Sequence, residues 1–181
     1  MNDSKLTLEE RVDLHRRMAE NYHNAYDEKA VKEGATYNEW VFADDAVYFS
    51  PYFGQGLINL KEHPVSVTAS ATMEAKAYSL QFPDWGPEQF KCWPADNGFA
   101  MQTLFSGHTQ DGVKMSFYAY GFVETNESGE ITRWETHVSE DYNAFLDVAI
   151  GVHGPFDNDA TAYMEALDRT LKKVGIELPM K

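Results

Sequence analysis

Two neighbouring stretches of the chain decide the fold: Phe99-Ala-Met-Gln-Thr-Leu-Phe-Ser-Gly-His-Thr109 and Lys114-Met-Ser-Phe-Tyr-Ala-Tyr-Gly-Phe-Val-Glu-Thr125. Both contain aromatic residues that favour strands, and the turn signal Gln110-Asp-Gly112 lies between them. They predict two long antiparallel strands joined by a hairpin. The second strand is apolar on both faces, with Phe117 on one and Tyr118 on the other. Because a second apolar face has to be covered, we expect a homodimer or higher homo-oligomer that forms through the back of the sheet.

Shorter segments on either side extend this sheet. The residue pattern predicts strands over residues 90–95 and 131–139, next to the central hairpin. An earlier strand is expected over residues 46–50, and it ends before Pro51. Ala43-Asp-Asp45, ahead of that strand, is interpreted as a turn.

Helices precede and follow the strands. Thr7-Leu-Glu-Glu10 has the form of a capping box, and the apolar residues after it recur every three or four positions. We therefore expect a first helix from Thr7 to near Gly34. Further helices are predicted over residues 37–42, 64–77, 142–146 and 158–174.

This segregation of helices and strands indicates an α+β fold, in which a curved antiparallel sheet packs against N-terminal helices. A sheet of this kind leaves room for an internal pocket between the two layers. We expect one domain, with an α+β body over residues 1–150 and a C-terminal helical extension of the same domain over residues 151–181.

Composition restricts the partners. The 181 residues carry a net charge of −14, which argues against binding to nucleic acid or to an anionic membrane surface. No apolar run approaches the roughly 20 residues of a membrane-spanning helix, and no signal-peptide pattern is present. Cys92 is the only cysteine, which fits a reducing compartment, so we expect a cytoplasmic protein. Aromatic residues make up 14% of the chain, which suits a pocket for an aromatic ligand.

The sequence shows none of the common cofactor or metal motifs. Its six histidines are not arranged as HExxH, HxH or a Cys/His cluster. Glycine-rich phosphate loops and the GxSxG nucleophile motif are missing as well. We therefore expect an activity that needs neither a metal nor a nucleotide cofactor.

Two histidines are candidates for proton transfer, because imidazole titrates near neutral pH. His108 lies late in the first long strand, and its alternative is a surface histidine beside the hairpin turn. His137 shares one face of the last strand with Arg133 and Glu135. These three side chains form either a polar ladder in the pocket or a solvated face with cross-strand salt bridges.

A third candidate group lies at the end of the first helix. Tyr22 and Tyr26 are four residues apart, and so are His23 and Asp27. In an apolar cavity a Tyr and a carboxylate could bind a phenol or hydroxyl, and burial would raise the pKa of Asp27. The alternative is an ordinary capped helix with tyrosines in the core.

Several short motifs resemble those of a known superfamily. Phe42-Ala-Asp-Asp-Ala46 resembles the second-helix exit of the nuclear transport factor 2-like superfamily. Phe82-Pro-Asp84, Gly107-His-Thr109 and Gly129-Glu-Ile-Thr-Arg-Trp134 resemble landmarks of the SnoaL-like polyketide cyclases. Ala25-Tyr-Asp-Glu-Lys29 resembles the first-helix segment of scytalone dehydratase. Their order and spacing carry the resemblance, which covers roughly residues 8–150.

The resemblance implies a cone-shaped fold with a pocket between a curved sheet and helices, often dimeric, and enzymes that need no cofactor. By position, Tyr26 and Asp27 match the dehydratase Tyr–Asp pair, and His108 matches its strand histidine. Ser50 stands where ketosteroid isomerases carry their Asp base, which puts steroid isomerisation in doubt.

We therefore expect a cofactor-independent lyase that acts on a phenolic or aromatic small molecule. The chain is similar to the deformylating lyases of this superfamily, which convert lignin-derived diarylpropane diols to stilbenes and release formaldehyde. The alternatives are a SnoaL-like cyclase or dehydratase of a polyketide-type substrate, and a non-catalytic module that binds a small molecule.

The residues assigned to this chemistry fall into two groups. The candidate catalytic residues are Asp27, His108, His137 and Tyr26. The candidate substrate-binding residues are Tyr22, Tyr48, Trp85, Tyr120 and Trp134.

Overall fold

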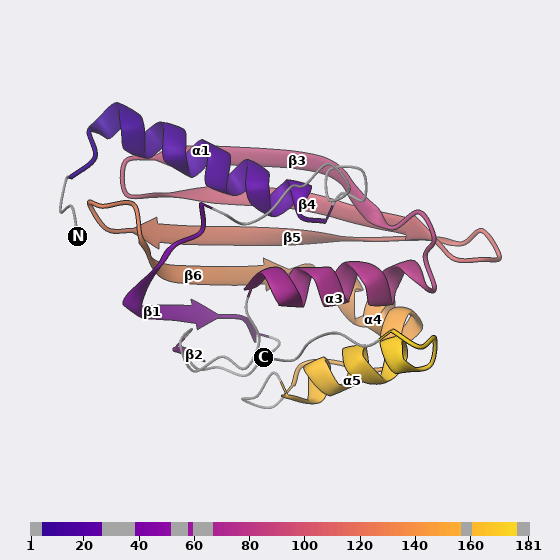
Figure 1. Cartoon of the computed structure of the whole chain (residues 1–181). Helices are drawn as coiled ribbons and strands as arrows, with labels where there is room; N and C mark the ends of the chain where they lie inside the picture. The colour runs from indigo at the N-terminus through magenta and orange to yellow at the C-terminus, as the bar shows by residue number, and fades with distance from the viewer. Residues whose placement is uncertain (1–4, 27–38, 52–57, 60–66, 157–160, 177–181) are drawn as a thin grey trace.

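A six-stranded sheet forms the centre of the structure, which is a computed structural model that describes residues 5–26, 39–51, 58–59, 67–156 and 161–176 (Figure 1). Its strands lie in the spatial order β2-β1-β6-β5-β4-β3. Neighbouring strands are antiparallel except β1 and β6, which run parallel. The strands are β1 (Phe42–Phe49), β2 (Ile58–Asn59), β3 (Gly86–Ala95), β4 (Gly98–His108), β5 (Lys114–Thr125) and β6 (Ile131–Val138).

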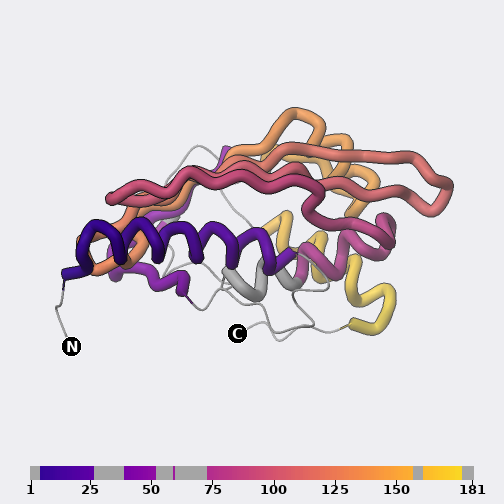
Figure 2. Tube along the Cα trace, turned by 90° about the horizontal axis from the view of Figure 1, so that it is seen from above, coloured from indigo at the N-terminus to yellow at the C-terminus, as the bar shows by residue number. Residues whose placement is uncertain are grey.

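Helices pack against this sheet. They are α1 (Leu8–Asn24), α3 (Val67–Ser79), α4 (Asp141–Ile150) and α5 (Thr161–Lys172). Figure 2 shows α1, α3 and α5 on the same side of the sheet. The predicted α+β class, with a curved sheet against helices, is confirmed. Within the described ranges, no helix is both long and apolar enough to cross a membrane.

Two aromatic clusters fill the space between the sheet and the helices. The C-terminal cluster gathers buried side chains of α3, α4 and α5 over β4 and β5, with Phe145 fully buried among them. The N-terminal cluster gathers those of α1 and β1 over the other end of the strands, around Trp134. Tyr26, just after α1, packs against both clusters. Alternate residues of β4 and β5 are buried, because successive side chains of a strand point to opposite faces.

The first turn of α1 has the expected capping box. Thr7 Oγ1 accepts the backbone N–H of Glu10, and the Glu10 carboxylate accepts the Thr7 N–H in return.

A buried histidine fixes α1 on the sheet. His15 is fully buried, with Nδ1 2.7 Å from the carbonyl oxygen of Ala95 and Nε2 2.8 Å from Thr125 Oγ1. Both ring nitrogens therefore tie the helix to strand ends, and burial lowers the pKa of His15.

The first strand differs from its prediction. Ala43-Asp-Asp45 belongs to β1 and is not a turn, and residues 39–42 of the predicted second helix are not helical. β1 pairs with β6 at Phe42 and again at Val47, with an irregularity between them. The two exposed aspartates lie in that irregular stretch, where ladder pairing is interrupted and strand-disfavoured residues are tolerated. Residues 37–38 lie outside the described residues.

Other boundaries differ by a few residues. α1 ends at Asn24, well before Gly34, and residues 27–38 are not described. β3 begins at Gly86 and not at residue 90, because an edge strand accommodates Pro87. The two strands of the long hairpin lie within one residue of their predicted bounds.

The packing of α4 predicts a large difference between two of its residues. Phe145 stacks on Phe82 at 4.7 Å between ring centroids, so Phe145→Ala leaves a cavity. We expect the free energy of unfolding to fall by about 3–5 kcal/mol in a denaturant titration. The control Val148→Ala, at a position 44% exposed on the same helix, changes it by less than about 0.5 kcal/mol. Equal effects of the two substitutions would contradict this packing.

Candidate active site

One carboxyl group lies between the helices and the sheet. Glu74 is the only acidic residue of α3, and its helix neighbours Met73 and Ala77 are buried. Its Oε1 accepts a hydrogen bond from the hydroxyl of Tyr163 at 2.9 Å, and its Oε2 accepts one from the hydroxyl of Tyr26 at 2.9 Å. Burial raises the pKa of Glu74, and these two hydrogen bonds oppose the shift only in part.

Three tyrosine hydroxyls meet beside this carboxyl. The hydroxyls of Tyr78 and Tyr142 are 3.1 Å apart, those of Tyr142 and Tyr163 are 3.3 Å apart, and Tyr78 also contacts Tyr163. They come from α3, α4 and α5, so the site holds three helices together. Burial raises the pKa of all three phenols, which therefore stay neutral and keep their protons for donation.

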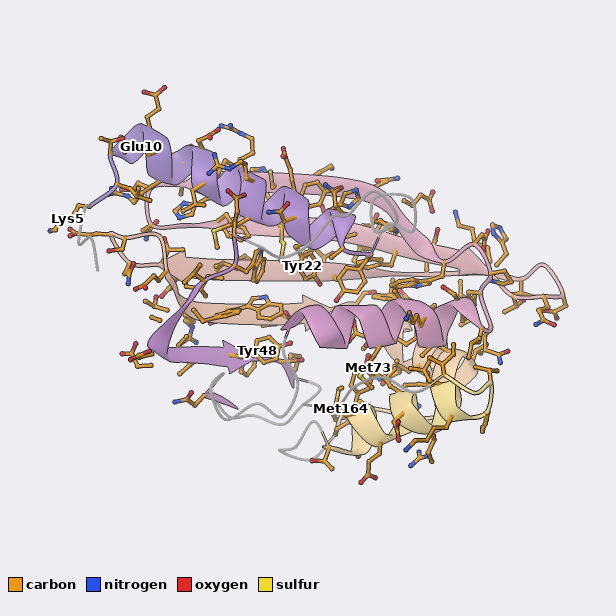
Figure 3. The ribbon with its side chains drawn as sticks, in the orientation of Figure 1. Lys5, Glu10, Tyr22, Tyr48, Met73 and Met164 are labelled. Atoms are coloured by element: carbon orange, nitrogen blue, oxygen red, sulfur yellow. The ribbon has the colours of Figure 1, made fainter. Side chains whose placement is uncertain are left out.

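Two further tyrosines extend the group toward α1 and β1. Tyr22 hydrogen-bonds with Tyr26, and burial raises its pKa. Burial also raises the pKa of Tyr48, to about 12. Figure 3 shows Tyr22 beneath α1 and Tyr48 on β1. We call Glu74 and the tyrosines around it the tyrosine–glutamate cluster, which contains six of the ten tyrosines of the chain. Its members are Glu74, Tyr22, Tyr26, Tyr48, Tyr78, Tyr142 and Tyr163.

Counting hydrogens shows how a proton on Glu74 would change this cluster. Tyr78, Tyr142 and Tyr163 make three contacts among themselves, and Tyr163 makes a fourth with Glu74. Each hydroxyl has one hydrogen, so with Tyr163 donating to an ionised Glu74 one of the three contacts among the tyrosines has no hydrogen. A proton on Glu74 Oε1 would reverse the hydrogen bond between Tyr163 and Glu74, and the three tyrosine hydrogens would then serve the three contacts among the tyrosines.

The surroundings of the cluster are aromatic. Tyr26 makes edge contacts with Trp85 and Phe105, at centroid distances of 5.9 and 5.2 Å. Burial and two tyrosine hydroxyls account for the pKa of Glu74, with no contribution from a Lys or Arg among the described side chains. Tyr26, Glu74 and Tyr142 are partly buried residues at this site. This arrangement suits an uncharged aromatic molecule.

The structure gathers five of the predicted site residues in the interior. Tyr26, Tyr22 and Tyr48 belong to the tyrosine–glutamate cluster, while Trp85 packs on Tyr26 and Trp134 packs on Tyr48. Asp27, the predicted partner of Tyr26, lies outside the described residues.

The other three lie on the opposite face of the sheet. His108 alternates with the inward Phe105 and Gly107; its Nδ1–H donates to Asp84 at 2.7 Å, and its side chain is 49% exposed. His137 faces Tyr120 across β5 and β6, with Nε2 3.2 Å from Glu135 Oε2. These geometries match the solvated alternatives considered from the sequence, and the catalytic roles of both histidines stay predictions.

Glu74 and three of its tyrosines were missed by sequence reasoning. The three are Tyr78, Tyr142 and Tyr163. One signal was available, since Glu74 is a lone acid in a helix of Ala, Met and small residues, with Tyr78 one turn later. Tyr142 and Tyr163 reach the cluster only because α4 and α5 pack beside α3, and no local sequence pattern predicts that packing. Among the described side chains, no three of His, Cys, Asp or Glu lie close enough together to hold a metal ion.

Comparisons with known proteins describe the fold. No protein-family model and no curated protein matches the sequence. A solved NTF2-like protein from Cytophaga hutchinsonii is 10% identical, with a TM-score of 0.46 over 71% of this chain and 99% of that one. A steroid delta-isomerase from Pseudomonas aeruginosa is 13% identical, with a TM-score of 0.41 over 93% and 97%. A protein from Jannaschia sp. that carries a SnoaL-like polyketide cyclase name is 12% identical, with a TM-score of 0.41 over 77% and 90%.

Two of these names, NTF2-like and SnoaL-like polyketide cyclase, are also those of the groups that the sequence motifs resemble. At such identities the likeness concerns the arrangement of helices and sheet and assigns no activity to this chain.

The raised pKa of Glu74 predicts how stability depends on pH. Native Glu74 keeps its proton at pH values above 4.5, the ordinary pKa of a Glu side chain, whereas the unfolded chain releases it there. The contribution of Glu74 to the free energy of unfolding therefore falls as the pH rises above 4.5, and Glu74→Gln abolishes this pH-dependent fall. We expect the free energy of unfolding of the variant, relative to the wild type, to rise between pH 4.5 and neutrality in urea titrations.

Glu88 supplies a control of opposite sign. Its carboxylate accepts hydrogen bonds from Lys114 and Ser106, which lower its pKa. The stability that this group contributes is present above its unfolded pKa and is lost as pH falls, so Glu88→Gln becomes relatively less stable as pH rises. If both variants changed in the same direction, Glu74 would not be a desolvated acid.

Proposed function

We propose that the protein is a cofactor-independent lyase that acts on an uncharged phenolic or aromatic small molecule, with Glu74 as its acid and base. The observation that carries this proposal is a desolvated carboxyl group among aromatic side chains, whose hydrogen-bond donors within the described residues are the hydroxyls of Tyr26 and Tyr163. A carboxylic acid with a raised pKa can give up a proton near neutral pH and take one back. Neutral phenols beside it can donate to a substrate oxygen on which negative charge develops.

A phenolic 1,2-diarylpropane-1,3-diol suits this chemistry. Glu74 protonates the benzylic hydroxyl, the carbon–oxygen bond breaks with its electron pair going to oxygen, and water leaves. The para-phenol gives its proton to water, and the resulting quinone methide acts as the electron sink. The Glu74 carboxylate then takes the proton of the primary hydroxyl. The carbon–carbon bond breaks and formaldehyde leaves, while the electron pair of the broken bond forms the stilbene double bond and restores the phenolate, which takes a proton back from water.

Substitution of Glu74 tests its role. We expect Glu74→Gln to lower kcat by about 10²–10⁴, because the amide cannot exchange a proton. His108→Ala tests the competing assignment made from the sequence: if Glu74 carries the reaction, this variant should keep kcat within a few-fold, because His108 lies on the opposite face of the sheet. Turnover that survives Glu74→Gln but fails in His108→Ala would place the reaction at the Asp84–His108 pair.

The products distinguish the candidate reactions. The purified protein is mixed with a phenolic diarylpropane diol while near-ultraviolet absorbance and formaldehyde are followed. A stilbene band with equimolar formaldehyde supports the deformylating lyase, and a conjugated band without formaldehyde indicates dehydration alone. An unchanged spectrum would remove this substrate class and favour a SnoaL-like cyclase or a binding module.

We also propose that the outer face of the sheet forms a homodimer. Trp93, Ala100 and Phe122 lie side by side across β3, β4 and β5, and Trp93 and Phe122 are 54% and 49% exposed. Such a contiguous apolar surface is typical of an interface between subunits.

Replacing one of these side chains tests the interface. Phe122→Glu places a charge on the apolar surface, and we expect sedimentation to show a monomer where the wild type is a dimer. Val113→Glu, at a hairpin position that is equally exposed, is the control and leaves the assembly unchanged. A wild type that is monomeric at all concentrations would contradict the proposal.

A further inference from the structure

Two indole N–H groups are buried without an acceptor. Trp85 and Trp134 are 6% and 8% exposed, and the Nε1 atom of each has no hydrogen-bond partner among the described residues. The other two tryptophans differ, since Trp40 donates to the carbonyl oxygen of Met18 at 2.8 Å and Trp93 is exposed. Buried donors are normally paired, so an unpaired pair in one protein needs an explanation.

Both indoles touch the tyrosine–glutamate cluster. The ring of Trp85 lies 5.1 Å from that of Tyr78 between centroids, and the ring of Trp134 lies 4.6 Å from that of Tyr48. They belong to different halves of the core, because Trp85 is in the C-terminal cluster and Trp134 in the N-terminal cluster. Glu74 lies within the group that both contact.

Ring contacts give the separation of the two indoles. Trp134 contacts Tyr22 at 6.3 Å, Tyr22 contacts Tyr26 at 5.3 Å, and Tyr26 contacts Trp85 at 5.9 Å between centroids. The rings of Tyr22 and Tyr26 fill this path, so a ligand that reaches both indoles has to lie alongside these two tyrosines and span a similar length. A molecule that contains two linked aromatic rings has that length.

We propose that Trp85 and Trp134 donate hydrogen bonds to oxygen atoms near the two ends of an elongated two-ring ligand. The inference rests on the proposed function, and it names how the substrate is held. Ether, hydroxyl or carbonyl oxygens fit these donors. A carboxylate does not, because indole N–H groups carry no charge and Glu74 has no cationic partner among the described residues to offset a second acid.

The test is a nitrogen–proton correlation spectrum of the full chain, in which each of the four tryptophans gives one indole signal. Single Trp→Phe variants assign the signals. A phenolic diarylpropane diol is then titrated in, alongside a single-ring phenol. We expect the Trp85 and Trp134 proton signals to move downfield with the diol and to exchange more slowly with deuterium, while the hydrogen-bonded Trp40 signal moves little. The single-ring phenol should shift at most one of them.

Binding by variants supplies the second readout. Trp85→Phe and Trp134→Phe keep most of the ring and lose the N–H, and each is expected to weaken binding of the diol by about 3- to 10-fold. Both substitutions also remove buried ring volume, so each variant is expected to lose some thermal stability, and the indole signals of the wild type carry the donor assignment. Trp93→Phe is the matched control and should leave binding unchanged.

The outcomes separate this inference from the proposed function. Shifted Trp85 and Trp134 signals without product formation would support hydrogen bonding by both indoles and would overturn the proposed lyase activity. Product formation with both indole signals unmoved would overturn the donor role of the indoles and would still support the lyase activity. If neither signal moves at the highest soluble diol concentration, the donor role is wrong.

Discussion

The desolvated carboxyl group of Glu74 is the constraint on which the interior of this protein depends. A buried carboxyl destabilises the fold unless its oxygens find donors or it keeps its proton. Here Tyr26 and Tyr163 supply donors from outside its own helix. Because these donors come from the end of α1 and from α5, the position of one acid fixes how helices distant in sequence meet over the sheet.

The same constraint joins structure to chemistry. With Tyr163 donating to an ionised Glu74, the three mutually contacting tyrosine hydroxyls have two hydrogens for three contacts, and a proton on Glu74 Oε1 would supply the missing one. The aromatic clusters on both sides keep water away from part of this site and present flat apolar surfaces to a ring-containing ligand. Proton exchange, neutral phenol donors and an aromatic lining are together what a cofactor-independent elimination needs.

Sequence patterns predicted the sheet better than the site. Strand alternation and turn residues located β4 and β5 closely, because both signals are local. The Asp44–Asp45 pair was wrongly interpreted as a turn, because the irregular pairing of β1 at this point tolerates aspartates that a regular strand disfavours. Tyr22, Tyr26 and Tyr48 were expected near a ligand, but Glu74 was not, since its importance comes from partners 48 and 89 residues away in the chain. His108 and His137 were equally plausible from spacing, and only strand pairing showed which face they occupy.

The pH at which Glu74 loses its proton tests the central claim most directly. The infrared spectrum of the wild type in heavy water is compared with that of Glu74→Gln over a range of pH, and the difference isolates the Glu74 carboxyl. Our account predicts a carbonyl stretching band of a protonated carboxylic acid that persists above the ordinary Glu pKa of 4.5, that fades in the wild type as the pH is raised further, and that is absent from the variant. A difference that contains only carboxylate bands at every pH above 4.5 would contradict it.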